Sequence, residues 1–146
     1  MAEQSLQTKV HIDFDLEPNV MIFGNATTLG QVFLNLLLNA VDAVGNNHQP
    51  QISFRLFTEA ITKVVLDIQD NGTGVSDENI QHLFDPFFTT KDNGTGLGLS
   101  IVHQIITEHQ GSISVLSTGE NGTIFRIILP KLLRPKVIPP GDINVN

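Results

Sequence analysis

Hydrophobic and polar residues alternate strictly from Val10 to Leu16. This alternation places the apolar side chains on one face and His11, Asp13 and Asp15 on the other, which is typical of a half-buried β-strand. A short second strand is predicted over Asn19–Phe23, before the turn-forming Gly-Asn pair that follows it. The first part of the chain therefore predicts two strands in sequence.

The period then changes from two residues to about 3.6, which indicates an amphipathic helix. Asn25 is a suitable N-cap for this helix, and Gly45 follows its expected end near Val44. The apolar stripe consists of Leu29, Val32, Phe33, Leu36, Leu37, Ala40, Val41 and Val44.

The remaining patterns predict four more strands and two more helices. One helix should run from Asp77 to about Phe84, because it must stop before Pro86. The other should run from about Leu97 to Gln110. The expected strands are Ile52–Leu56, Val64–Ile68, Ser112–Leu116 and Thr123–Leu129.

The order ββαββααββ predicts an α/β (α+β) two-layer sandwich. We expect one mixed, largely antiparallel sheet with three helices on one face. Residues 1–130 should form this domain, and residues 131–146, which contain several prolines and no periodic pattern, should form a flexible tail.

Composition narrows the possible functions. The 146-residue chain has a formal net charge of −7, which disfavours bare nucleic acid and anionic membranes as partners. It has no cysteine, which excludes a disulfide framework, a thiol nucleophile and a cysteine zinc site. No apolar run approaches the roughly 20 residues of a membrane span, and no secretory signal is recognisable. We expect a cytoplasmic domain without direct membrane contact, whose parent protein could still be membrane-anchored.

Asp70 has the same parity as the apolar residues of Val64–Ile68 and should therefore point toward the helix layer. A buried carboxylate needs hydrogen-bond donors, which either its own turn or a ligand could supply. Gly72 and Gly74 allow a close backbone approach. Thr123 should point inward by the same parity argument, toward Asp70, toward a ligand, or simply as a strand residue.

A polar stripe follows one edge of the long helix: Gln31, Asn35, Asn39 and Asp42. It is either a solvated face or a source of oxygen ligands for a hard cation such as Mg²⁺. Because no cluster of carboxylates accompanies it, such an ion would have to arrive together with substrate phosphates.

Glycines precede the last predicted helix, in the segment Gly94–Ser100. Such a segment either admits a phosphate chain to the helix N-terminus or acts as a flexible hinge. Its spacing fits neither the dinucleotide-binding fingerprint nor a P-loop. The preceding Phe84–Lys91 segment could form a lid or anchor a loop to the core, and Lys91 supplies a positive charge where phosphates would lie.

The order of these motifs resembles the catalytic, ATP-binding domain of two-component sensor histidine kinases, a Bergerat-type fold of the gyrase, chaperone, histidine-kinase and mismatch-repair ATPase superfamily. The FFTTK form of the phenylalanine segment looks most like kinases of the nitrogen-regulation type. The similarity extends over nearly all of residues 8–130. Its motifs are QVFLNLLLNAVDA (N box, Gln31–Ala43), DNGTGV (G1 box, Asp70–Val75), FDPFFTTK (F box, Phe84–Lys91), GTGLGLSIV (G2 box, Gly94–Val102) and a closing threonine-containing segment, Asn121–Pro130.

The resemblance implies ATP and Mg²⁺ as cofactors. Asp70 would accept a hydrogen bond from the adenine amino group, Thr123 would assist through water, and Asn39 would bind Mg²⁺. Asn35 and Lys91 would be the catalytic residues. The implied nucleotide-binding residues are Asn35, Asn39, Asp42, Asp70, Gly72, Gly74, Val75, Phe87, Phe88, Thr89, Thr90, Lys91, Gly94, Thr95, Gly96, Leu97, Gly98, Leu99 and Thr123.

Asn35 occupies the position where hydrolytic relatives carry a glutamate that activates water. An amide is no strong base, which agrees with transfer of the γ-phosphoryl group to a histidine rather than rapid hydrolysis. The family's phosphoacceptor motif is absent from this sequence, and His109 is expected to be structural or solvated. The acceptor should therefore lie on a separate dimerisation domain, and this domain should not phosphorylate itself.

Partners implied by the resemblance are that dimerisation domain and, indirectly, a response regulator. Leu34 and Leu38 lie off the main apolar stripe and could dock on the dimerisation domain or be buried under a loop. Two other functions share the fold: a serine kinase of the anti-sigma-factor type, and a nucleotide-sensing module without transferase activity.

Overall fold

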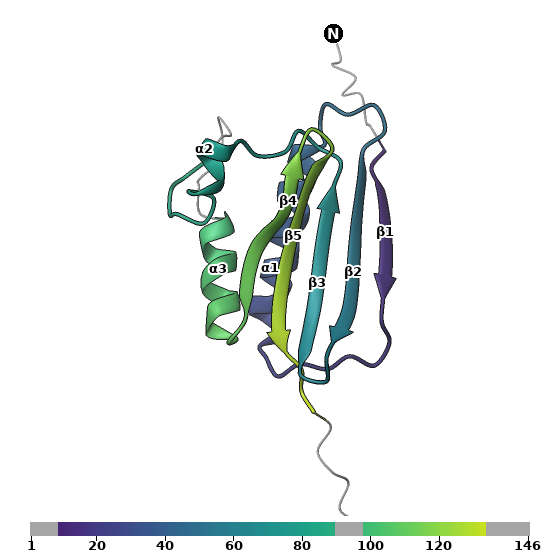
Figure 1. Ribbon diagram of the computed structural model, residues 1–146, viewed down its shortest axis with the longest axis vertical. Helices are drawn as coiled ribbons and strands as arrows, with labels where there is room; N and C mark the ends of the chain where they lie inside the picture. Colours follow the sequence, from purple (N-terminus) through teal and green to yellow (C-terminus); the bar gives the residue numbers. More distant parts are fainter. Residues whose placement is uncertain (1–8, 90–97, 134–146) are drawn as a thin grey trace, which may run out of the picture.

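Five strands form one mixed sheet in the computed structural model, which describes residues 9–89 and 98–133 (Figure 1). The spatial order is β1-β2-β3-β5-β4, in which β1 and β2 are parallel and the other neighbours are antiparallel. This arrangement confirms the predicted fold class. The strands are β1 (His11–Leu16), β2 (Gln51–Glu59), β3 (Lys63–Asp70), β4 (Ser112–Gly119) and β5 (Gly122–Pro130).

The described helices lie on one face of this sheet (Figure 1). They are α1 (Ala26–Ala43), α2 (Asp77–Ile80) and α3 (Gly98–Glu108). The predicted cap of α1 is confirmed, because the Asn25 side-chain oxygen accepts hydrogen bonds from the backbone N–H groups of Thr27 and Thr28 at 2.9 and 3.2 Å. None of the described helices is long and apolar enough to cross a membrane.

The core lies between the helices and the sheet. Its helical side comes from α1 and α3, whose apolar stripes agree with the predicted 3.6-residue period. Its main buried residues are Leu29, Val32, Leu36 and Ala40 of α1, Val102, Ile105 and Ile106 of α3, and Ile52, Phe54, Leu66, Ile68, Ile113, Phe125, Ile127 and Leu129 of the sheet.

Two sequence-based predictions about local structure are wrong. Residues 19–23 do not form a strand, because Asn19 has a left-handed φ of 61° and the chain turns from the sheet edge toward α1. In this segment the Met21 carbonyl instead accepts a backbone hydrogen bond from the Leu132 N–H at 2.8 Å. The helix expected up to Phe84 ends at Ile80, and turns continue the chain.

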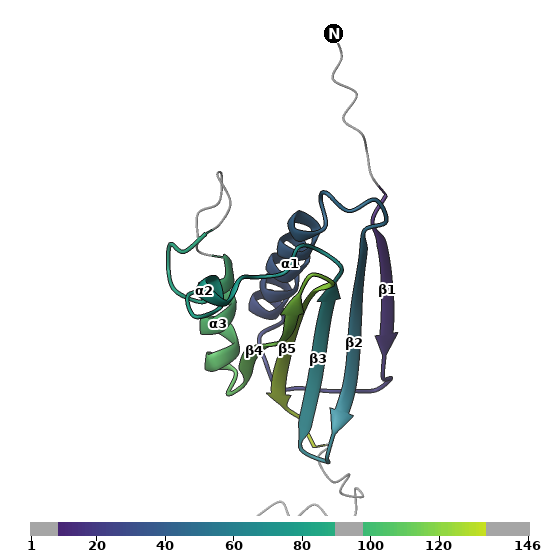
Figure 2. The same cartoon turned by 45° about the horizontal axis from the view of Figure 1, so that its top comes forward.

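The predicted half-burial of the first strand is also wrong, since every residue of β1 is exposed. The alternation itself is correct, because Phe14 pairs with Phe54 in the sheet and stacks on it at 5.4 Å between ring centroids. However, α1 lies over β3 and α3 lies against β4. Both views show α1 behind the β3–β5–β4 side of the sheet rather than behind β1 (Figure 1 and Figure 2). None of the described helices therefore covers the apolar face of β1.

Candidate functional site

Asp70 ends β3 and is only 3% exposed, so the predicted inward orientation is confirmed. Its carboxylate accepts a hydrogen bond from the Gly72 backbone N–H at 2.9 Å. Burial raises the pKa of Asp70, and hydrogen bonds from the backbone N–H groups of Gly72 and Thr123 oppose this effect. The carboxylate thus bonds its own turn, as one of the two interpretations predicted, while lying at the helix-facing side of a strand end.

Thr123 is the register partner of Asp70 and is also buried, which confirms its predicted orientation. Its hydroxyl lies 3.0 Å from the hydroxyl of Thr118, which in turn accepts a hydrogen bond from the Val75 backbone N–H at 2.8 Å. These contacts connect the G1 box to both strands of the β4–β5 hairpin. Local sequence patterns do not predict this role of Thr118, because it depends on the register of β4 against β5.

The G1 glycines approach the protein's own backbone closely. A Cβ atom on Gly72 would lie 2.4 Å from the Ala43 carbonyl oxygen at the end of α1. Gly74 has a φ of +78°, and a Cβ there would lie 2.3 Å from the Gly119 carbonyl oxygen. Packing alone therefore requires glycine at both positions, and their contact with a nucleotide stays a prediction.

Asn71 ties the same loop to the start of β2. Its side-chain oxygen accepts a hydrogen bond from Gln51 N–H at 2.8 Å, and its side-chain amide donates to the Gln49 carbonyl at 2.8 Å. In addition, the Asn47 amide donates to the Asn71 carbonyl at 2.7 Å. The sequence suggested only a turn here, whereas the structure makes Asn71 the residue that holds the loop beside Asp70.

The polar edge of α1 contacts the start of α3. The Asn35 amide donates to the Gly98 carbonyl at 3.4 Å, so this position is not simply a solvated surface. Asn39, one turn further along α1, is partly buried, whereas Gln31 and Asp42 are exposed. In the described part of the chain, no group of three or more His, Cys, Asp or Glu side chains could hold a metal ion.

The F box divides into packed and projecting residues. Phe84 and Phe88 pack against the core, and the Phe84 ring meets the Phe125 ring edge-on at 6.5 Å. Phe87 is 75% exposed and has a φ of +66°, an uncommon conformation for a bulky residue. The prediction that the phenylalanines anchor a loop therefore holds for Phe84 and Phe88 but not for Phe87.

The remaining predicted site residues differ in their exposure. Val75 and Leu99 are partly buried against the core, whereas Thr89 and Gly98 are exposed. Several lie outside the described residues: Thr90, Lys91, Gly94, Thr95, Gly96 and Leu97.

These contacts bring three motifs together around the second half of α1. The end of α1 touches the G1 box through Ala43 and Gly72, and its middle touches the start of α3 through Asn35 and Gly98. An acidic side chain, two helix amides and Gly98 at the start of α3 thus lie around one region, which is a donor and acceptor set suited to a base and its phosphates.

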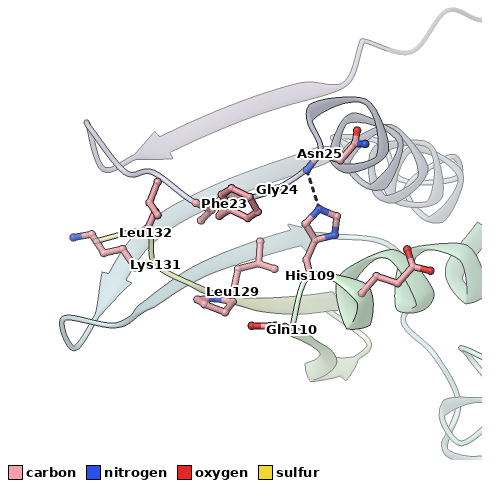
Figure 3. A pocket seen from close by; sticks show the side chains of 11 residues that line it. Phe23, Gly24, Asn25, His109, Gln110, Leu129, Lys131 and Leu132 are labelled. Atoms are coloured by element: carbon pink, nitrogen blue, oxygen red, sulfur yellow. Dashed lines mark hydrogen bonds between the residues drawn. The ribbon is translucent and has the colours of Figure 1, made fainter. Parts of the chain in front are cut away.

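A pocket at the other end of the helix layer is a different feature (Figure 3). There, His109 Nε2 accepts a hydrogen bond from the Asn25 backbone N–H at 3.1 Å, while its Nδ1 lies 2.7 Å from the Ile105 carbonyl. This geometry requires the Nδ1-protonated tautomer and makes His109 a structural link between α1 and α3, in agreement with its predicted structural role. None of the predicted nucleotide-binding residues that the structure describes lines this pocket.

Comparison with known proteins agrees with this geometry. The family described as histidine kinase-, DNA gyrase B- and HSP90-like ATPase matches residues 24–133. The chain is 37% identical to sporulation kinase B of Bacillus subtilis over 121 residues, which cover 83% of this chain and 28% of that protein. It is 42% identical to the sensor histidine kinase ZraS of Salmonella typhimurium over 106 residues, which cover 73% of this chain and 22% of that protein.

Solved structures of similar proteins share the fold. A mycobacterial sensor histidine kinase, MprB, superposes with a TM-score of 0.75 at 27% identity, covering 84% of both chains. The catalytic domain of the histidine kinase ThkA has a TM-score of 0.73 at 33% identity, covering 84% of this chain and 80% of that one. The present chain thus corresponds to a catalytic-domain-sized part of much longer curated relatives.

Proposed function

The chain belongs to the histidine kinase-, DNA gyrase B- and HSP90-like ATPase family, and we propose that it binds ATP with Mg²⁺ and transfers the γ-phosphoryl group to a histidine on a separate dimerisation domain. The observation that carries this proposal is the buried Asp70 carboxylate beside the contacts that join the N box, G1 box and G2 box. The chain spans 28% or less of the curated relatives named above, so the reaction of a whole kinase is proposed for this domain rather than established.

Asp70 is the proposed adenine-recognition residue. Its side chain is nearly inaccessible to bulk water, and an exocyclic amino group would supply a further donor to the ionised form. Guanine carries a carbonyl at the equivalent position and would place an acceptor against an acceptor. A buried polar group left unpaired in this way typically loses about 1–3 kcal/mol, so this contact favours ATP over GTP.

Asn39 is the proposed magnesium-binding residue, although other metal sites in proteins commonly use several carboxylates. The residues present fit an ion held mainly by substrate phosphates, because the described part of the chain has no acidic cluster and α1 offers amide oxygens. When bound, Mg²⁺ would neutralise part of the triphosphate charge.

Asn35 is proposed to position the start of α3 rather than to activate water. Its side-chain amide already donates to the Gly98 carbonyl at 3.4 Å, and an amide is not a general base. In the proposed transfer, a nitrogen of the acceptor imidazole bonds to the γ-phosphorus, while the bond to the bridging oxygen breaks and ADP leaves. The catalytic role of Lys91, outside the described residues, stays a prediction.

The proposed partner is a histidine-bearing dimerisation domain of the same kinase, with a response regulator as the later acceptor. Leu34 and Leu38 are 54% and 52% exposed. The interpretation that a loop buries them is therefore wrong, and docking of these two side chains on the dimerisation domain stays a prediction. A cytoplasmic location and membership of the nitrogen-regulation type also stay predictions.

Two experiments test the proposal. Calorimetry should show that ATP binds and that its affinity rises in the presence of Mg²⁺. The affinity for ATP should exceed that for GTP by at least about tenfold, since 1.4 kcal/mol corresponds to that factor. Equal heat with GTP would contradict the role of Asp70. Incubation with γ-labelled ATP and the cognate dimerisation domain should give an acid-labile, alkali-stable label on histidine. A serine label would instead indicate a kinase of the anti-sigma-factor type, and ATP binding without any label a nucleotide-sensing module.

A further inference from the structure

The turn between β4 and β5 lies at the edge of the sheet where β3 ends and the G1 box begins (Figure 1). The two parts are in close contact, because a Cβ atom on Gly122 would lie 1.9 Å from the Asp70 carbonyl oxygen. The Thr118 hydroxyl, at the end of β4, accepts a hydrogen bond from the Val75 N–H at 2.8 Å. The β4–β5 hairpin therefore forms one side of the region around Asp70.

A β-bulge turns Thr118 toward this region. The register of β4 against β5 shifts between Val115 and Ser117, so Leu116 is an additional residue in β4. Without it, strict alternation would place Thr118 on the face opposite to Val115, which packs against the core. The bulge shifts the alternation by one residue and makes Thr118 the register partner of Thr123. Bulges often lie beside functional sites, where they re-aim a side chain.

The hydroxyls of Thr118 and Thr123 form a pair whose donor matters for the site. Their oxygens lie 3.0 Å apart, and either one could be the donor by distance alone. If Thr118 accepted from both Val75 and Thr123, its own proton would need a further acceptor, and no other partner of this hydroxyl is found among the described residues. Donation from Thr118 to Thr123 uses this proton and leaves the Thr123 proton for another acceptor.

Thr123 and Asp70 together present a donor beside an acceptor. They are register partners, and both side chains are buried. The ionised carboxylate can only accept hydrogen bonds, whereas the Thr123 hydroxyl can donate its remaining proton. Adenine carries an amino donor next to a ring-nitrogen acceptor, which is complementary to this pair. Guanine carries the reverse order, a carbonyl next to an N–H donor, and is not.

We propose that Thr118 is a positioning residue for base recognition: it accepts the Val75 N–H, donates to the Thr123 hydroxyl, and thereby directs the Thr123 proton toward the nucleobase, either directly or through a water molecule. This inference rests on the proposed function, because it adds a residue to the adenine site of that function. Thr118 acts on the base only through Thr123 and the G1 box, so it is not a catalytic residue.

A purely structural role of Thr118 predicts a different result. If Thr118 only fastened the hairpin to the G1 box through Val75, loss of its hydroxyl would weaken the binding of ATP and GTP alike. If it also directs the Thr123 proton, the same loss weakens ATP binding more than GTP binding, because only adenine offers an acceptor next to its amino group. The ratio of the two affinities therefore separates the two roles.

The test compares Thr118 variants with a matched control in the 146-residue chain. Thr118→Val keeps nearly the same shape without the hydroxyl, Thr118→Ala removes the hydroxyl with a smaller side chain, and Thr118→Ser retains it. Ser117→Ala is the control, because it removes a hydroxyl from an exposed neighbouring residue that points to the opposite face of β4. Calorimetry with Mg²⁺ measures the affinities for ATP and GTP, and urea denaturation verifies that each variant is folded. Hydrogen exchange measured by NMR follows the Val75 amide without nucleotide.

We expect both hydroxyl-free variants to lower the ratio of ATP affinity to GTP affinity about fivefold, the factor that corresponds to the loss of one hydrogen bond. The Val75 amide should lose its protection from exchange in these variants. Thr118→Ser and Ser117→Ala should keep the wild-type ratio.

An unchanged ratio in the hydroxyl-free variants, or an equal loss in Thr118→Ser, would overturn the inference and leave the proposed function intact. A Val75 amide that exchanges equally fast in the wild type and in Thr118→Val would overturn it as well, because the hydrogen bond would then contribute nothing. A wild-type chain that binds ATP and GTP equally would instead overturn the proposed role of Asp70, and this inference with it.

Discussion

Gly122 offers the sharpest test of how the end of β3 is built. It follows the β4–β5 turn with a φ of +109°, and a Cβ atom there would lie 1.9 Å from the Asp70 carbonyl oxygen. Gly122→Ala must therefore adopt an unfavourable backbone conformation and also displace the backbone of Asp70. The conformation costs about 1–3 kcal/mol, and forcing an extra methyl group into packed structure adds about 1–3 kcal/mol.

We therefore expect Gly122→Ala to lower the free energy of unfolding by roughly 2–6 kcal/mol, the range obtained when both effects apply together. The measurement is urea denaturation followed by circular dichroism. Gly30→Ala is the matched control, because Gly30 lies inside α1 and, apart from its chain neighbours and the nearby backbone of α1, nothing lies within 4 Å of a Cβ placed there. Alanine is the better helix former, so this control should raise stability by about 0.5–1 kcal/mol. A Gly122→Ala variant within about 0.5 kcal/mol of wild type, the usual range for surface changes, would refute the close-contact reasoning.

Three further predictions concern single side chains. Because burial raises the pKa of Asp70, protonation of this side chain favours the folded state, and this contribution to stability is lost as pH rises through the folded-state pKa. In urea titrations, Asp70→Asn should therefore gain stability relative to the wild type between acidic and neutral pH. Calorimetry should show that the same variant no longer binds ATP. Arg126→Ala removes two 2.8 Å hydrogen bonds to the partly buried Asp67 and should lower the free energy of unfolding by about 1–3 kcal/mol. Adding Asp67→Ala should lower it further by a smaller amount. If the effects of the two substitutions simply add, the two side chains are not a coupled pair. His109→Ala removes the acceptor for the Asn25 N–H and should lower the melting temperature by an amount equivalent to about 1 kcal/mol. Its affinity for ATP should be unchanged. A large loss of ATP affinity would instead make His109 part of the nucleotide site.

Alternation along the strands predicted most of the sheet correctly. The parity of Val64–Ile68 placed Asp70 on the core side, and the parity of the last strand placed Thr123 beside it; both side chains are buried. Periodicity identifies which residues share a face, but it does not say whether another element covers that face. For this reason the alternation of β1 was real while its predicted burial was wrong.

Sequence patterns did not predict the contacts between distant segments. The Asn71 side chain makes hydrogen bonds at the start of β2. The Thr118 hydroxyl, on the edge strand β4, accepts a hydrogen bond from the G1 box. Both contacts depend on strand register and on the path of a loop, neither of which is encoded in local periodicity. The positive φ of Asn19, which turns the chain where a strand was predicted, is likewise a consequence of the route from the sheet edge to α1.

The position of α1 connects the proposed nucleotide site with the rest of the helix layer. One flank bonds to the start of α3 through Asn35, while the other carries the exposed Phe33 and Val41. The helix is fixed at its beginning by the Asn25 link to His109 and at its end by the contact of Ala43 with Gly72. Because packed helices shift as units rather than bend locally, a displacement of α1 would move the Asn35 contact with Gly98 and the Ala43 contact with Gly72 together.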